Sequence, residues 1–250
     1  MKNTHLIILV SALICINNIL VSAKAEDSKD TLDDILQKTT TTILENKLKK
    51  IKKAEEVEIG QIMFKVKRTN LWLKEKSDGK KKLGEFAEIT LPGKLYPSPK
   101  EIPAIEKKDI DRSTIDGTVA SAFSANKSGD LNWIVDNFTD KDKEKVKAVF
   151  KNKKILEQSK ADAQKIISAY VIGQADYKGS VLVFIEQDYL DGRKIKESLA
   201  CKKTEKGWKI TNEFSEDRTF DIVFAALSSG EVSIKGKEPL KEKSAEDLKS

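Results

Sequence analysis

The sequence predicts an α+β fold in which helices pack on a curved antiparallel sheet. Before residue 150 apolar residues recur at helical spacing, and from Ile166 onward they alternate in four short runs joined by glycine-containing turns. Hydrophobic residues make up 39% of the 250 residues, which is enough for a buried core, while 34% charged residues give a very polar surface. Helices followed by an antiparallel meander are the order typical of this class.

The first residues indicate export. Residues 6–16 are apolar enough for the core of a signal peptide, and Ser22-Ala23-Lys24-Ala25 offers a small-x-small cleavage site. We expect cleavage after Ala25 and a periplasmic or extracellular location. One alternative is an uncleaved anchor, although Asn17-Asn18 interrupts its apolar run. Another is a lipoprotein acylated at Cys15, although the residue before this cysteine is not small.

Removal of residues 1–25 restricts the available chemistry. The segment contains His5, which is the chain's single histidine, and Cys15, one of its two cysteines. The remaining chain keeps Cys201 and a net charge of +4, because two lysines and no acid are lost. This composition excludes an intramolecular disulfide, a Ser-His-Asp triad and a histidine-bearing zinc site. We expect no metal or cofactor.

Residues 26–91 are predicted to form a long helix followed by a β-hairpin. Apolar positions from Leu32 to Ile51 keep helical spacing, and the helix should end near Ala54. From Val57 the period changes to alternation, which predicts strands over 62–73 and 86–91 on either side of a turn at residues 77–79.

Residues 92–111 are predicted to be a linker between two domains. Pro92-Gly93 is expected to end the hairpin, and the segment holds four of the chain's five prolines. Proline restricts the backbone and favours extended conformations, which suits a linker.

Residues 112–229 are predicted to form the second domain. Helices are expected from residue 113, over 131–138 and over 140–150, and strands over 165–176, 179–187, 193–204 and 207–214. Residues 218–227 carry apolar positions at helical spacing and could cover a strand that is apolar on both sides. Residues 230–250, rich in lysine and glutamate, are expected to be a disordered tail.

The second domain resembles the nuclear transport factor 2-like superfamily, which has a cystatin-like α+β cone. The similarity covers about residues 112–214 and is carried by AFSANKSGDLNWIVDNF and by a last strand that begins Gly-Trp-Lys-Ile. It implies a curved four-stranded sheet wrapped around a helix. Members of the superfamily include small-molecule isomerases, dehydratases and binding modules without catalysis, and this chain is most similar to small exported members without known activity.

Polar residues on the apolar faces of the predicted strands are the candidate site residues. A carboxyl group in an apolar cone has a raised pKa and can act as a base or a donor. One hypothesis is therefore an isomerase or dehydratase with Glu197 as base and Tyr170 as the polarising acid. Cys201 follows Leu199 on an apolar face, which favours an inert buried thiol over a reactive one. The remaining candidates for lining a pocket are Glu186, Asn212 and Trp208, and the tryptophan is more typical of a core position.

The favoured function is an exported, non-catalytic binding or interaction protein. Its partner would be a protein, an envelope polymer or a small apolar ligand. The alternatives are the enzyme above and a structural envelope component that dimerises through its sheet. Lysine runs such as residues 151–154 indicate mainly solvated surface, with attraction to an anionic membrane or cell-wall polymer as the alternative. Arginines and stacking aromatics do not accompany these runs, so a nucleic-acid partner is not expected.

Overall fold

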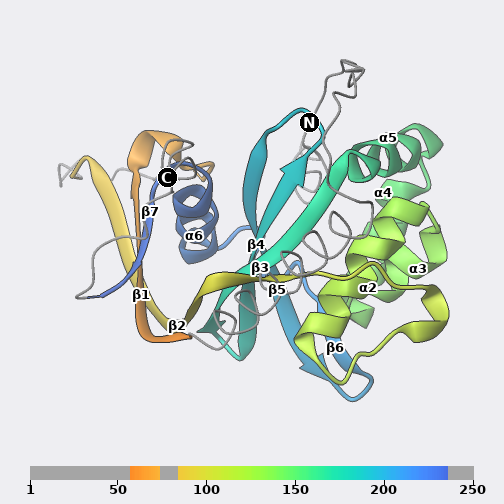
Figure 1. Cartoon of the computed structure of the whole chain (residues 1–250), viewed down its shortest axis with the longest axis horizontal. Helices are drawn as coiled ribbons and strands as arrows, with labels where there is room; N and C mark the ends of the chain where they lie inside the picture. Colours follow the sequence, from red (N-terminus) through yellow and green to blue (C-terminus); the bar gives the residue numbers. More distant parts are fainter. Residues whose placement is uncertain (1–56, 74–83, 236–250) are drawn as a thin grey trace, which may run out of the picture.

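The computed structural model describes residues 57–73 and 84–235, and within them the fold is α+β (Figure 1). Seven strands form one antiparallel sheet in the order β6-β5-β4-β3-β2-β1-β7. The strands are β1 Glu58–Lys67, β2 Phe86–Glu101, β3 Ile166–Tyr177, β4 Ser180–Tyr189, β5 Lys194–Thr204, β6 Gly207–Ile210 and β7 Glu231–Ile234. The helices are α2 Ile115–Ser128, α3 Leu131–Asp136, α4 Asp140–Phe150, α5 Lys153–Gln164 and α6 Arg218–Ser229, with 3-10 turns at Arg68–Asn70 and Lys107–Asp109. The predicted α+β class is confirmed, while the signal peptide, the long first helix and residues 236–250 lie outside the described residues.

Strand β2 corrects the expectation that Pro92-Gly93 ends the hairpin. The strand continues to Glu101 and pairs with β1 on one side and β3 on the other, so the sheet runs through part of the expected linker. Two of the prolines lie where the pairing of β2 with β3 is interrupted. Pro97 and Pro99 lie between Leu95 and Lys100, where the β2–β3 register shifts. The extended conformation that proline favours thus belongs to a strand rather than to a linker.

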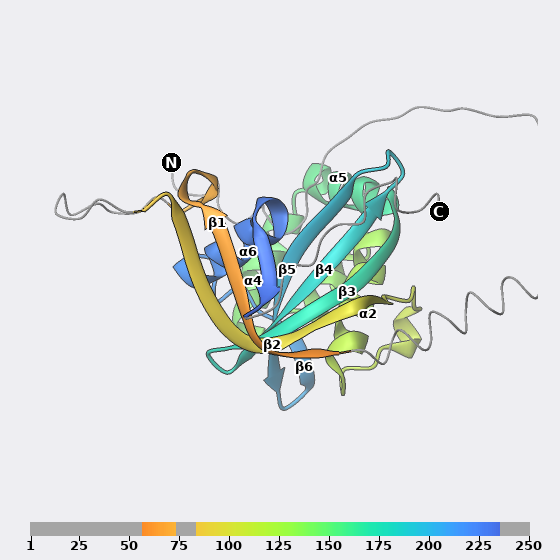
Figure 2. The same ribbon diagram turned by 60° about the vertical axis from the view of Figure 1, so that its left-hand side comes forward.

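A row of small residues crosses the sheet where β1 and β2, which form one half with β7, meet the other half, β3 to β6. Gly60 lies opposite Gly93, and Gly93 lies opposite Ala175. A Cβ atom on Gly93 would lie 2.3 Å from the carbonyl oxygen of Gln174 and 2.8 Å from Cδ1 of Ile62. Figure 2 shows β1 and β2 turning away from β3 and β4 at this end of the sheet. Glycine at position 93 therefore permits a close approach of β2 to β3.

Replacing Gly93 by alanine should lower the free energy of unfolding by about 1–3 kcal/mol, because backbone atoms have to move to admit the methyl group. Urea denaturation measures the change. Gly84→Ala is the matched control, since a Cβ atom there would meet nothing within 4 Å. Equal stabilities of the two variants would contradict the close approach.

Helix α6 lies on one face of the sheet and contacts both of its halves, through β1, β2, β5 and β7 (Figure 1). The core between them contains Val223 of α6 and the fully buried Phe64 and Phe184, whose rings meet edge to face at 5.4 Å. Burial of such large rings is the main stabilising contribution. The predicted cover over strand 180–189 is thus present.

Helices α2 to α5 form a layer on the other side of the molecule (Figure 1). Val119 of α2 packs against Val183 and Ile185 of β4, and a further core joins Trp133 of α3 with Phe150 of α4. No helix among residues 57–73 and 84–235 combines the length and the apolar character needed to cross a membrane.

Two elements were not predicted. Helix α5 presents few large apolar residues, and its Ile155 and Leu156 contribute only to the margin of a core. Strand β7 pairs with β1 and occupies residues that were expected to belong to a disordered tail, so that expectation is wrong for 231–234. The four residues of β7 are too few for the sequence to show an alternation of apolar and polar residues.

Candidate functional site

The sheet separates the two residues of the predicted catalytic pair. Glu197 lies opposite Ile185, and Ile185 lies opposite Val171. Tyr170 lies opposite Glu186, one position further along both strands. Since cross-strand partners share a face and successive residues alternate, Glu197 and Tyr170 project to opposite faces. They cannot act together on one substrate atom.

Glu197 belongs to a row of hydrogen-bonded side chains on the α2 face. The amide Nε2 of Gln187 donates to Oε1 of Glu197, and the hydroxyl of Tyr189 donates to Oε1 of Gln187 over 2.8 Å. Burial of the carboxyl group raises the pKa of Glu197 to about 7, and the Gln187 bond offsets part of this rise. Burial, followed by the nearby charge of Glu197, raises the pKa of Tyr189 to about 12. Glu197 can therefore exchange a proton at neutral pH, but its hydrogen-bond partner among the described residues is an amide.

Glu186 and Tyr170 occupy the opposite face of the sheet. Glu186 is a counterion there: its carboxyl oxygens lie 3.3 Å from Nζ of Lys194 and 3.7 Å from Nζ of Lys196. Lys194 also pairs with Asp188 at 2.9 Å. This arrangement describes a polar sheet surface, in which an acid balances lysines, rather than the apolar pocket that was predicted.

The last strand ends earlier than predicted. Strand β6 stops at Ile210, so Asn212 lies beyond it. The buried carboxylate of Asp142 ends the strand, because its Oδ2 accepts from the hydroxyl of Thr211 and from the backbone N–H of Asn212, both over 3.0 Å. Oδ2 also accepts from the hydroxyl of Thr139 over 2.6 Å. Asp142 thus joins the first turn of α4 to the end of the sheet.

Trp208 is half-buried and packs against the core beneath α2, in agreement with the interpretation as a core residue. Asn212 donates its backbone N–H to Asp142, while its side-chain Oδ1 is buried without a hydrogen bond to any described residue. Neither residue lies beside Glu186, so the three predicted pocket candidates do not assemble into one site.

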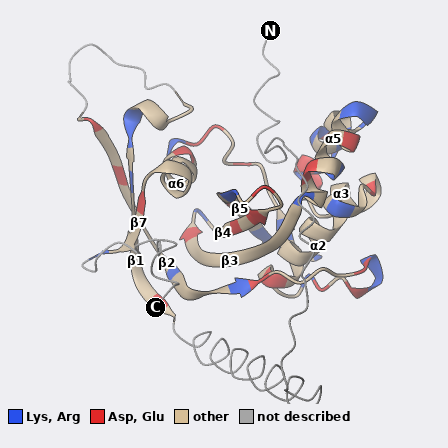
Figure 3. Cartoon of the chain, turned by 45° about the horizontal axis from the view of Figure 1, so that its top comes forward, with Lys and Arg blue, Asp and Glu red and all other residues tan. Residues whose placement is uncertain are grey.

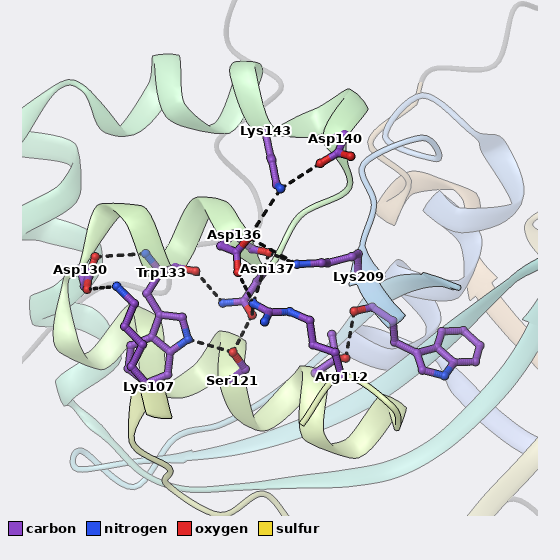
Figure 4. Close-up of polar contacts among 12 residues, drawn as sticks. Lys107, Arg112, Ser121, Asp130, Trp133, Asp136, Asn137, Asp140, Lys143 and Lys209 are labelled. Atoms are coloured by element: carbon purple, nitrogen blue, oxygen red, sulfur yellow. Dashed lines mark hydrogen bonds and ion pairs between the residues drawn. The ribbon is translucent and has the colours of Figure 1, made fainter. Parts of the chain in front are cut away.

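A cluster of charges around Asp136 was missed by the sequence analysis (Figure 4). Nζ of Lys209 donates to the backbone oxygen of Asp136, and Nη2 of Arg112 lies 2.7 Å from its Oδ2. Nζ of Lys143 lies 3.5 Å from Oδ1. Burial, followed by the charge of Arg112, lowers the pKa of Lys209. Lys209 is buried, and nothing in the local sequence signals its burial.

The neighbouring polar residues complete this connection between the helices and the sheet (Figure 4). The indole Nε1 of Trp133 donates to the hydroxyl of Ser121 over 2.9 Å, and that hydroxyl donates to Oδ1 of Asn137 over 2.6 Å. The backbone oxygen of Asn137 accepts from the N–H of Ile210 over 2.8 Å. Each of these buried polar groups thus has a hydrogen-bond partner, as is usual for buried polar groups. Their role is to fasten α2 and α3 to β6.

Cys201 is fully buried, and burial raises the pKa of its thiol to about 12. A thiol in this state is a poor nucleophile, which supports the interpretation as an inert core residue. Within the described residues no group of three or more histidine, cysteine, aspartate or glutamate side chains is placed to hold a metal ion.

Comparisons of the chain with protein-family models, with curated proteins and with solved structures gave no match.

Proposed function

We propose that the chain is an exported binding or interaction protein without catalytic activity, and that residues 112–214 form a cone-like unit similar to the nuclear transport factor 2-like superfamily. The order of elements within these residues, four helices α2 to α5 followed by the antiparallel strands β3 to β6, supports this similarity. The separation of Glu197 from Tyr170 speaks against proton transfer by this pair, and the other polar clusters are used to join helices to the sheet.

The observation that carries the binding function is the outer face of β1 and β2. Alternate residues of β1 face α6, which leaves Ile59, Met63 and Lys65 on the other side of the strand. Ile59 is 80% exposed and Phe86 is 40% exposed. The Nζ atom of Lys65 lies 4.9 Å from the centre of the Phe86 ring, which places this ring on the same outer face. Phe86 lies opposite Lys67, so Ile59 and Phe86 are eight positions apart along β1, about 26 Å, with Met63 between them. This outer face, with an exposed apolar side chain at each end, is where we propose that the partner binds.

The double substitution Ile59→Lys with Phe86→Lys should weaken retention of the purified protein on isolated cell envelopes by about tenfold or more, because it places two charges in the contact. Co-sedimentation with the envelopes measures retention. Glu197→Gln with Tyr170→Phe is the control and should be retained like the wild type. Loss of retention in a folded control variant, with the Ile59 and Phe86 variant unaffected, would favour the pocket of an isomerase instead.

The same face supports a second candidate, a structural envelope component that dimerises through its sheet. Sedimentation velocity distinguishes the two. A dimer that dissociates on Ile59→Lys with Phe86→Lys supports self-association, and a strict monomer at high concentration removes it.

A further inference from the structure

The corner between α4 and α5 carries five lysines and no acid over residues 145–156. Lys151, the C-cap of α4, follows Lys147 by four residues and therefore lies on the same side of the helix. Each of the five is exposed, and none forms an ion pair with another described residue; they are Lys145, Lys147, Lys151, Lys153 and Lys154. We call this group the lysine corner. It lies at the outer edge of the helical layer (Figure 1), and Figure 3 shows blue segments around α5 with red ones beside them.

Helix stability explains only part of the lysine corner, since Lys147 and Lys151 lie at the C-terminal end of α4, where cations are favourable. The positive end of a helix dipole lies at its N-terminus, where acids stabilise and lysines destabilise. The first turn of α5 nevertheless holds Lys153 and Lys154 and no acid. Elsewhere on the described surface many lysines are neutralised, for example Lys107 by Asp130 at 2.7 Å and Lys178 by Asp217 at 2.7 Å. The corner is therefore a local excess of positive charge.

We propose that the lysine corner binds an anionic polymer of the cell envelope whose phosphate groups are spaced along a flexible chain. The inference rests on the proposed function, since it names a partner class for an exported binding protein. Five lysines held on two connected helices present a high local charge density to such a chain.

The chemistry of the corner favours this partner over others. Arginine reads the planar geometry of a carboxylate or a phosphate through two parallel hydrogen bonds, and residues 145–156 contain no arginine. Lysine binds a phosphate as a point charge in any orientation, which suits phosphates on a flexible chain. Their one aromatic residue, Phe150, is buried, so no ring is available for stacking on bases. The large exposed apolar side chains of the described chain lie outside α4 and α5, so the corner has no residue to insert into a bilayer.

The test is a titration of the purified protein with fluorescently labelled poly(glycerol phosphate) at several salt concentrations. Affinity should fall steeply with salt, as expected for release of counterions from a polyanion. Lys153→Glu with Lys154→Glu should weaken binding by about tenfold or more at low salt. The same change should leave the melting temperature unchanged or raise it, because it places acids at the start of α5. A loss of binding in this variant therefore cannot be attributed to unfolding.

Lys203→Glu with Lys235→Glu is the matched control, since both lysines are exposed, lie away from the corner and give the same change in net charge. It should weaken binding by less than about threefold. Equal losses in the two variants, or no binding by the wild type at low salt, would overturn the proposal. Tighter binding to vesicles containing anionic lipid or to duplex DNA would overturn it in favour of those partners.

The two proposals fail separately. Ile59→Lys with Phe86→Lys should leave binding to poly(glycerol phosphate) intact, because those residues belong to β1 and β2. Envelope retention that depends on Ile59 and Phe86, without any binding of the polymer, would reject the lysine corner and leave the proposed function standing. If the wild type neither stays with the envelopes nor binds the polymer, the proposed function and the lysine corner are both rejected.

Discussion

Glu197→Gln should raise the free energy of unfolding by about 3 kcal/mol at pH 8 and leave it nearly unchanged at pH 4. The folded-state pKa of Glu197, about 7, lies above its ordinary value of 4.5. The folded wild type therefore binds more protons than the unfolded chain between these values. Its stability should fall as pH rises through this window and stay low above it. Glutamine carries no charge at any pH, so the stability of the variant should not fall in this way.

Urea denaturation of wild type and variant at a series of pH values measures the difference. Glu186→Gln is the control on the other face of the sheet, where lysines offset the charge of the carboxylate. Removing a carboxylate that two lysines already balance should give no comparable gain in stability at pH 8. Parallel stability profiles for wild type and Glu197→Gln would show that the carboxyl group is better solvated than its position beneath α2 implies.

Asp142→Ala should lower the free energy of unfolding by about 3 kcal/mol. Asp142 is 3% exposed, and its Oδ2 accepts hydrogen bonds from two hydroxyl groups and one backbone N–H. Removing it leaves three donors without their acceptor at the junction of α4 with the end of β6. Such donors cost free energy because water reaches them poorly.

Thermal and urea denaturation at pH 7 check this loss. Asn212→Ala provides a close comparison, because the bond to Asp142 comes from the backbone of Asn212 and survives the change. It should cost less than about 1 kcal/mol. A similar cost for both variants would indicate that the Asp142 junction contributes little.

Features that depend on neighbouring residues could be predicted from the sequence. Glycine in each hairpin has a positive φ, as at Gly179, Gly192 and Gly207, and a short polar cap begins α2 at Thr114. Alternation within a strand also placed Glu197 on an apolar face.

Features that depend on the register between strands could not be predicted from the sequence. Whether Glu197 and Tyr170 share a face is decided by the pairing of β3, β4 and β5, and β3 contains two register shifts. The burial of Lys209 depends on the segment that α3 and α4 place beside β6. The prolines of β2 suggested a linker. They fit a strand because its pairing with β3 is interrupted beside them, and the sequence of β2 alone does not reveal that interruption.

The segment beside β6 also determines whether this edge of the sheet can pair with a strand of another molecule. The N–H of Ile210 donates to Asn137 and its C=O accepts from Thr139, while the N–H of Trp208 donates to Arg112 and its C=O accepts from the hydroxyl of Thr118. An incoming strand would find these backbone groups already occupied. Open sheet edges are the usual starting points for edge-to-edge aggregation. The chain therefore closes this end of the sheet with its own loops, and lateral growth of aggregates from β6 would first require α3 to detach.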